Sequence, residues 1–378
     1  MSLPNGSLAT RVFVPDVGPC VVHLADGRAY DITAQFPTMR DLCEQADPAA
    51  VLRTCKGPDV GAFADLETNA AAATRNVTLP WLLAPVDLQA IKAAGVTFAS
   101  SMIERVIEEK AQGDPSAAAA IRVQIEKLVG HDLRQLKPGS AQAEQLKQTL
   151  IANGAWSAYL EVGIGPDAEI FTKCQPMAAV GSGMEIGVHP KSSWNNPEPE
   201  VVLIVNSRGS IVGAALGNDV NLRDVEGRSA LLLGKAKDNN ASAAIGPFIR
   251  FFDKEFSLDD IRKMDVLLTV EGKDGHMLKG GSSLANISRD PADIAAQTIN
   301  RHHQYPDGFA LYLGTMFAPV ADRDVAGQGF THKTGDCVTV SAPGLGALRN
   351  TVVATDKAEP WTFGAADLMR NLARRKLI

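Results

Sequence analysis

Three acidic residues lie close together in the chain near residue 200. Glu198 and Glu200 are separated by one residue, so on a β-strand both side chains point to the same face. An apolar run, a turn signal and a second apolar run follow, and Asp219 comes shortly after the second run. A two-residue loop at Ser207-Arg208 would place Glu198 opposite Gly217, with Asp219 diagonally beside Glu198. The segment therefore predicts three converging carboxylates. This prediction depends on the strand register, because a one-residue shift would move Asp219 to the other face.

Converging carboxylates favour a bound cation. They repel one another unless a cation neutralises them or a proton is taken up. The three residues offer only oxygen ligands and no Cys or His lies nearby in the chain, which favours Mg²⁺ or Mn²⁺ first and Ca²⁺ second. The spacing fits a simpler alternative equally well, in which Glu198 and Glu200 lie on a solvated strand face and Asp219 is a turn residue.

Two further segments carry groups that suit catalysis. Lys235 and Lys237 follow the hairpin, and a lysine near a metal and apolar walls can act as a base through a lowered pKa or hold a substrate carboxylate. An exposed lysine pair fits the same pattern. Gly314-Thr315 ends the apolar run 309–313, where a hydroxyl and a backbone N–H can bind an anion, or where a strand simply ends.

Composition and charge exclude several classes of protein. The chain of 378 residues is 45% hydrophobic and 21% charged, which excludes a disordered or coiled-coil protein. A formal net charge of −6 without a basic block gives no indication of a nucleic-acid partner. No apolar run is long enough to span a membrane, the N-terminus lacks a signal-peptide pattern, and the five cysteines are scattered. We therefore expect a cytoplasmic protein with reduced thiols and no membrane partner.

The elements that must position these residues are mostly strands. Residues 1–75 are expected to form a small N-terminal α+β domain, with strands at 11–14, 20–24 and 29–32 and helices at 38–44 and 48–54. Residues 76–378 form the second domain. It begins with a strand at 96–99 and helices at 103–112, 115–129 and 140–153. It continues with strands at 201–205, 211–216, 266–270, 309–313, 338–341 and 348–353 and helices at 291–302 and 365–374. This order favours an α+β fold dominated by strands over a doubly wound sheet, and no glycine pattern of a nucleotide site is present.

Together these segments resemble the fumarylacetoacetate hydrolase superfamily over about residues 82–350. The matching segments are Glu169-Ile-Phe-Thr-Lys173, Glu198-Pro-Glu200, Gly217-Asn-Asp-Val-Asn-Leu-Arg-Asp224, Lys237, Gly314-Thr315, and Gly335-Asp-Cys-Val-Thr-Val together with Gly344-Leu-Gly-Ala-Leu-Arg-Asn350. The resemblance implies a mixed β-roll core with a helical insertion, a homodimer or dimer of dimers, and Mg²⁺ with Mn²⁺ as the alternative. It places the metal ligands on Glu198, Glu200 and Asp219, the active-site lysine on Lys237, a substrate-contacting arginine on Arg223, and a threonine on Thr315 beside Gly314.

The sequence departs from the hydrolases of this family at two positions. Carbon–carbon hydrolases carry G-L-N-Y-x-x-H-x-x-E, whose His and Glu activate water. Here Ser101 stands in place of the histidine, while Glu104 keeps the glutamate. A serine hydroxyl is a poor general base at neutral pH. The family's N-D-x-S-A-R-D-x-Q ends here in Glu226, which adds an ionisable group near the site or forms a surface ion pair with Arg228.

In these departures the sequence resembles the dehydratase branch of the family. The resemblance implies a carbon–oxygen lyase that dehydrates a 2-keto-3-deoxy-D-pentonate, of the xylonate or arabinonate type, to 2,5-dioxopentanoate in oxidative pentose catabolism. We expect Lys237 and Glu104 to transfer protons with Glu226 as a shuttle, and the substrate to contact Arg223, Thr315, Gly314 and Ser101. Two alternatives stay open, a hydrolase of acylpyruvates and a protein that binds a sugar acid without turnover.

Overall fold

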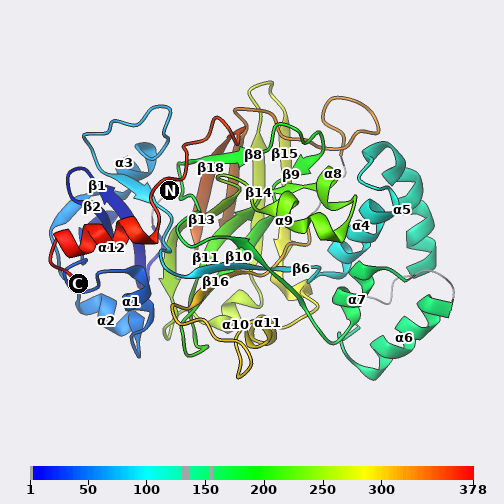
Figure 1. Cartoon of the computed structure of the whole chain (residues 1–378), viewed down its shortest axis with the longest axis horizontal. Coiled ribbons are helices and arrows are strands. Elements are labelled where there is room, and N and C mark those ends of the chain that lie inside the picture. Colours follow the sequence, from blue (N-terminus) through cyan, green and yellow to red (C-terminus); the bar gives the residue numbers. More distant parts are fainter. Residues whose placement is uncertain (1–2, 130–135, 153–155, 318, 320) are drawn as a thin grey trace.

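Two β-sheets form the body of the molecule, flanked by an N-terminal group of strands and a group of helices (Figure 1). The computed structural model describes residues 3–129, 136–152, 156–317, 319 and 321–378. The larger sheet has the order β4-β3-β2-β1-β13-β11-β10-β16-β6-β7, with β5 paired to β1. The smaller has the order β15-β14-β17-β18-β8. The prediction of an α+β fold dominated by strands is confirmed.

The N-terminal strands are continuous with the larger sheet. Its first five strands are β1 Leu8–Val14, β2 Gly18–Ala25, β3 Arg28–Asp31, β4 Asp59–Ala62 and β5 Trp81–Leu83. The helices between them are α1 Met39–Cys43, α2 Pro48–Thr54 and α3 Phe63–Thr68. Leu8 of β1 lies opposite Arg250 of β13, which joins this group to the rest of the sheet. The domain boundary after residue 75 stays a prediction.

The rest of the larger sheet carries the acidic residues. Its strands are β13 Ala243–Phe251, β11 Ile211–Asp219, β10 Pro199–Val205, β16 Phe309–Tyr312, β6 Ala90–Gly95 and β7 Glu169–Cys174. All of these pair antiparallel except β16 and β6, which run parallel. Every residue of β10 and β13 is buried, because both faces of the sheet are covered. Alternate residues therefore belong to different hydrophobic clusters.

The smaller sheet packs against one face of the larger one. Its strands are β15 Met277–Ser283, β14 Asp265–Glu271, β17 Cys337–Ala342, β18 Gly346–Ala354 and β8 Glu185–Val188. Leu203 of β10 and Leu216 of β11 belong to the same buried cluster as Leu268 of β14 and Val340 of β17. This shared core packs against one face of the β10–β11 hairpin and holds it in place.

A helical insertion with its own core lies on the opposite side from the N-terminal strands (Figure 1). It consists of α4 Ala99–Lys110, α5 Pro115–Val129, α6 Ala141–Ala152 and α7 Ala158–Ile164. The strand predicted at 96–99 is wrong, because β6 ends at Gly95 and Val96 has a positive φ of 55° that turns the chain into α4. The end predicted for the third helix, Asn153, lies outside the described residues.

Short elements complete the fold. They are β9 Asn195–Asn196, β12 Asn221–Leu222, α8 Arg223–Glu226, the 3₁₀ helix η2 Ala230–Leu232, α9 Leu233–Lys237, α10 Leu258–Ile261, the 3₁₀ helix η3 Leu284–Asn286, α11 Pro291–Thr298 and α12 Ala365–Arg374. The helix predicted at 291–302 therefore ends four residues early, at Thr298. Helix α12 returns to the N-terminal strands, where Asn371 donates a hydrogen bond to the carbonyl of Val17 (Figure 1). Among the described helices, none combines the length and the hydropathy needed to cross a bilayer.

Candidate active site

The hairpin β10–β11 brings the three predicted acids together, in a register that differs from the predicted one. Gly217 lies opposite Glu200 instead of Glu198, and the backbone N–H of Asp219 donates to the carbonyl of Glu198 at 3.0 Å. The prediction of a two-residue loop is wrong. Asn206 Oδ1 accepts hydrogen bonds from the N–H groups of both Arg208 and Ser210, and a β-bulge follows Ile204. The strand pairing is shifted by two residues from the predicted one, so all three side chains still point to the same face of the hairpin.

The three carboxylates form a buried cluster with the ligand set of a hard cation. One oxygen of each of Glu198, Glu200 and Asp219 lies within 4.8 Å of the others, and the residues are only 2–4% exposed. Burial, followed by repulsion from Asp219 and Glu198, raises the pKa of Glu200 well above its ordinary value. A divalent ion at these oxygens would relieve that repulsion, so the residues fit Mg²⁺ or Mn²⁺. The solvated strand face is thereby ruled out as a description of this hairpin.

Two lysines supply positive charge to the cluster. Lys237 Nζ lies 2.5 Å from Glu198 Oε2 and 3.1 Å from Asp219 Oδ2, and Lys173 Nζ lies 2.8 Å from Asp219 Oδ1. Lys237 is the last residue of α9 and is 3% exposed, whereas Lys235 on the same helix is exposed. Burial alone would lower the pKa of Lys237, but Asp219 and Glu198 raise it above its ordinary value. Without a bound cation, these two carboxylates therefore favour the protonated form of Lys237, whereas the lowered pKa was expected beside a metal ion.

Helix α4 contributes an arginine that the sequence analysis did not identify. Arg105 Nη2 lies 2.5 Å from Glu198 Oε1, and its Nη1 lies 2.7 Å from Glu226 Oε2 and 2.6 Å from Glu108 Oε2. Arg105 follows Ser101 by four residues, so both lie on one helix face. That spacing was the available signal, but the family motif ends at Glu104, one residue before Arg105.

A small cavity opens among these groups. It measures about 20 Å³ and is lined by Ala94, Gly95, Val96, Ser101, Arg105, Glu169, Phe171, Glu198, Glu200, Asp219, Glu226, Lys237, Gly314 and Thr315. Gly314 N–H donates to Glu200 Oε2 at 2.6 Å, and Ser101 Oγ donates to the carbonyl of Phe98 at 2.9 Å. Gly314 has a φ of +84°, and a Cβ there would lie 2.2 Å from Thr97 Oγ1, so only glycine fits.

Two of the predicted site residues do not line this cavity. Glu104 accepts hydrogen bonds from Arg122 at 2.7 and 3.0 Å and from Arg223 Nη2 at 3.3 Å. Arg223 Nε donates to Glu108 at 2.7 Å, and its guanidinium lies 4.2 Å from the centre of the Trp194 ring. These contacts hold α4 against α8. The other predicted site residues therefore line the cavity together, whereas Glu104 and Arg223 do not line it.

Glu169 is a second cavity residue to which the sequence analysis gave no role. It lies on β7 opposite Gly95, where a Cβ would lie 2.0 Å from Glu169 Oε2, so the glycine makes room for the carboxyl group. Burial, followed by the nearby Glu226, raises the pKa of Glu169 to about 7. The same burial raises the pKa of Glu226, against the effect of Arg105. The conspicuous signal was the acid that opens the Glu169–Lys173 motif.

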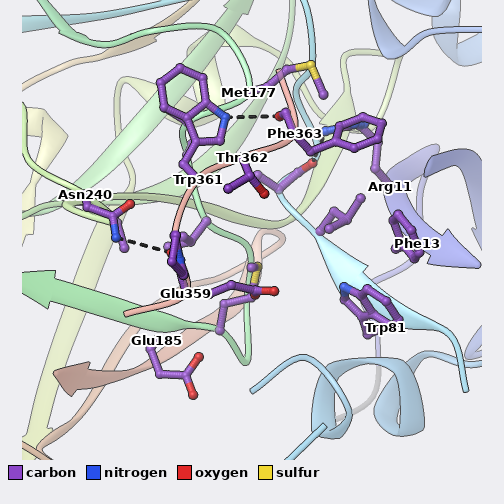
Figure 2. Close-up of a pocket in the computed structure, with 18 of the residues that line it drawn as sticks. Arg11, Phe13, Trp81, Met177, Glu185, Asn240, Glu359, Trp361, Thr362 and Phe363 are labelled. Atoms are coloured by element: carbon purple, nitrogen blue, oxygen red, sulfur yellow. Dashed lines mark hydrogen bonds between the residues drawn. The ribbon is translucent and has the colours of Figure 1, made fainter. Parts of the chain in front are cut away.

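A larger cavity lies elsewhere and lacks this chemistry. It measures about 180 Å³ and shares no lining residue with the acidic cavity. Figure 2 shows Phe13, Trp81, Trp361 and Phe363 around it, and the rings of Phe13 and Trp81 stack 4.4 Å apart. Its charged groups have partners within the protein, such as Arg75 with Glu359 at 2.9 Å. The chemistry therefore points to the smaller cavity.

Comparison with known proteins identifies the relatives of this chain. The family model described as "Fumarylacetoacetate (FAA) hydrolase C-terminal" matches residues 163–353. A protein of Haloferax volcanii named "Probable 2-keto-3-deoxyxylonate dehydratase" is 26% identical over 330 residues, covering 86% of this chain and 93% of that protein. A 2-dehydro-3-deoxy-D-arabinonate dehydratase of Saccharolobus solfataricus is 31% identical over 180 residues, covering 48% of this chain and 57% of that protein.

Solved structures share the fold. A structure described as "2-keto-3-deoxy-D-arabinonate dehydratase complexed with magnesium and 2,5-dioxopentanoate" aligns with a TM-score of 0.63 at 20% identity, over 92% of this chain and 99% of that chain. At this identity the likeness establishes the fold alone. Both curated relatives carry dehydratase names, in agreement with the enzyme class, a lyase, predicted from the sequence.

Proposed function

This chain belongs to the fumarylacetoacetate hydrolase family, and on that premise we propose that it dehydrates a 2-keto-3-deoxy-D-pentonate to 2,5-dioxopentanoate in a divalent-metal-dependent reaction. The observation that carries the proposal is the buried cluster of Glu198, Glu200 and Asp219 beside the amino group of Lys237. Ser101 occupies the position at which the hydrolases of the family have histidine, and no histidine is among the described residues that line the cavity. The curated relative that matches over most of this chain bears the name of a 2-keto-3-deoxyxylonate dehydratase.

Glu198, Glu200 and Asp219 would hold the ion. When bound there, a divalent ion acts as a Lewis acid on a 2-keto oxygen and so acidifies the hydrogens on C3. The backbone N–H of Gly314 keeps Glu200 oriented. Thr315 lines the same cavity, and its hydroxyl, which accepts from the N–H of Phe317 at 3.1 Å, would donate to the substrate carboxylate.

Dehydration needs at least two proton-transfer groups, because a proton leaves C3 and the hydroxyl on C4 leaves as water. Protonated Lys237 suits donation of a proton to the departing hydroxyl. Glu169 and Glu226 line the same cavity and suit removal of the C3 proton and the later shift of a proton from C5 to C3. A pKa of about 7 lets Glu169 both accept and release a proton near neutrality. We therefore assign to Glu104 and Arg223 the support of α4, in place of the direct roles that the sequence predicted.

The cavity must widen for this reaction. Its volume of about 20 Å³ holds roughly one water molecule, whereas the substrate is a five-carbon acid. Arg105 on α4 and Lys237 on α9 both line it, so we propose that helices α4 and α9 move apart when the substrate enters, while Arg105 stays paired with Glu226.

The test is incubation of the protein with Mg²⁺ and a panel of 2-keto acids, followed by identification of the products by mass. The proposal predicts 2,5-dioxopentanoate from a 2-keto-3-deoxypentonate. Cleavage of an acylpyruvate, with no dioxopentanoate formed, would establish the hydrolase instead. Calorimetric binding of the sugar acid without any product would establish the non-catalytic binding protein.

Three parts of the proposal rest on the sequence. They are the cytoplasmic location, the homodimer or dimer of dimers, and the separate N-terminal domain. Light scattering of the purified protein tests the second, and limited proteolysis near residue 75 tests the third.

A further inference from the structure

One guanidinium joins three carboxylates that come from three different elements. Arg105 of α4 contacts Glu108 of the same helix, Glu226 of α8, and Glu198, the residue before β10, all within 2.7 Å. Its side chain is 13% exposed. Burial opposes its charge, but Glu108, Glu226 and Glu198 together raise the pKa of Arg105 well above its ordinary value. Arg105 therefore carries a fixed positive charge at the cavity and cannot serve as a base.

Arg105 lies where its charge affects two functions. Glu198 has both of its oxygens engaged by cations, Oε1 by Arg105 and Oε2 by Lys237. A divalent ion that binds Glu198 must share this carboxylate with the guanidinium, and the two positive charges repel each other. Glu226 belongs to the short helix α8, and the contact with Arg105 at 2.7 Å is the ion pair that fixes its carboxylate at the cavity.

We propose that Arg105 is a positioning residue that holds the carboxylate of Glu226 at the acidic cavity and weakens the binding of the divalent ion at Glu198. The inference rests on the proposed function. It adds that Glu226, the acid in place of the family's glutamine, forms an ion pair with Arg105, which lies one helical turn after Ser101. The two substituted positions are thus linked through α4, and the helix that carries a base in the hydrolases carries a fixed charge here.

The test separates metal binding from turnover in three variants. Arg105→Met removes the charge and keeps an unbranched apolar stem, so we expect Mn²⁺ and Mg²⁺ to bind about tenfold more tightly in calorimetric titration. In the same variant kcat should fall about a hundredfold, because Glu226 is no longer held. Arg105→Lys keeps the charge but cannot bridge three carboxylates, so metal affinity should stay near that of the wild type while kcat falls about tenfold.

The control is Arg11→Met in the N-terminal strands. Arg11 is a buried arginine that donates to the carbonyls of Ala84 and Val86 and lies 3.7 Å from Asp87. Its loss should lower the melting temperature without changing metal affinity or kcat. If Arg105→Met fails to fold, Arg105→Lys alone decides, since an unchanged kcat there overturns the inference.

The outcomes distinguish this inference from the function on which it rests. A wild-type protein that binds no divalent ion contradicts the proposed function. A wild-type protein that binds the ion and forms dioxopentanoate, with Arg105→Met unchanged in both metal affinity and kcat, overturns the inference alone. Weaker metal binding in Arg105→Met also overturns it, because the arginine would then support the metal site.

Discussion

Two buried groups of charged side chains in this molecule differ in how their charges are balanced. In the loop before β17, Asp336 is 1% exposed and accepts hydrogen bonds from Arg323 at 2.6 and 2.8 Å and from the N–H of Lys333 at 2.9 Å. Burial alone would raise its pKa, but Arg323 and His332 hold the pKa of Asp336 well below the ordinary value. In the acidic cavity, Glu200 is equally buried and accepts one hydrogen bond from Gly314, and its pKa moves in the opposite direction.

The comparison shows that burial by itself does not mark a functional carboxylate. Asp336 is matched by donors, so its charge is a structural feature of the loop. Glu200 has two acidic neighbours and no cationic partner among the described side chains, so its charge is unbalanced. An excess of buried negative charge is what a metal-dependent site needs and what a structural ion pair avoids.

The largest effect should come from removing the unbalanced acid. Glu200→Gln deletes one metal ligand and relieves the repulsion with Asp219, so the fold should persist while metal-dependent turnover falls at least about a thousandfold. Initial rates from the dehydration assay measure the loss, and circular dichroism verifies the fold. Full activity in this variant would show that Glu200 is not a ligand of a catalytic metal ion.

The next largest effect should follow loss of the cation beside the acids. Lys237→Met should lower kcat by about 10²- to 10⁴-fold, because it removes the proposed proton donor, while metal binding persists because the three acids remain. The matched control is Lys235→Met, on the same helix but exposed, which should behave as the wild type. Equal activity of the two variants would contradict the role of Lys237.

The balanced cluster should respond in stability instead of turnover. Asp336→Asn removes the buried carboxylate that Arg323 contacts and leaves Arg323 only the more exposed Asp274 at 3.1 Å, which should lower the free energy of unfolding by about 2 kcal/mol. Chemical denaturation measures this change, and turnover per folded molecule should not change. A loss of turnover with unchanged stability would mean that the two clusters are not different in kind.

The smallest effect should be a pH dependence at the cavity. Glu169 has a pKa of about 7 in the folded protein, above the ordinary value of 4.5, so folding favours its protonated form. Between pH 4.5 and 7 the unfolded chain has lost this proton while the folded chain keeps it, so the group's contribution to stability decreases as pH rises through this range. Glu169→Gln should flatten the dependence of the melting temperature on pH there, measured without added metal. An unchanged slope would place the pKa of Glu169 near its ordinary value.

Local patterns in the sequence predicted much of the fold. The bounds predicted for α2, α5 and α12 match the structure, because Asp47-Pro48 and Asp114-Pro115 mark two of the starts and an amphipathic pattern marks the third. Strand β6 was not predicted, because Ala90–Gly95 contains few β-branched residues. The strand is stabilised by pairing with β16 and β7, which are distant in sequence.

The site could be predicted only where its residues share a hairpin. Glu198, Glu200 and Asp219 converge because side chains alternate along strands, and even a wrong loop length preserved their common face. The adjacent residues Glu104 and Arg105 point about 100° apart on a helix, and only packing decides which of them faces the cavity. Glu169 comes from a separate strand, so its place beside Glu226 depends on tertiary contacts that local patterns do not contain.

Metal binding by the three carboxylates is best tested with a crystal of the protein soaked in Mn²⁺, in which anomalous scattering locates the metal. We expect one strong peak within bonding distance of Glu198, Glu200 and Asp219, with Lys237 displaced from Glu198. A peak elsewhere in the molecule, or none at these three carboxylates, would contradict this expectation.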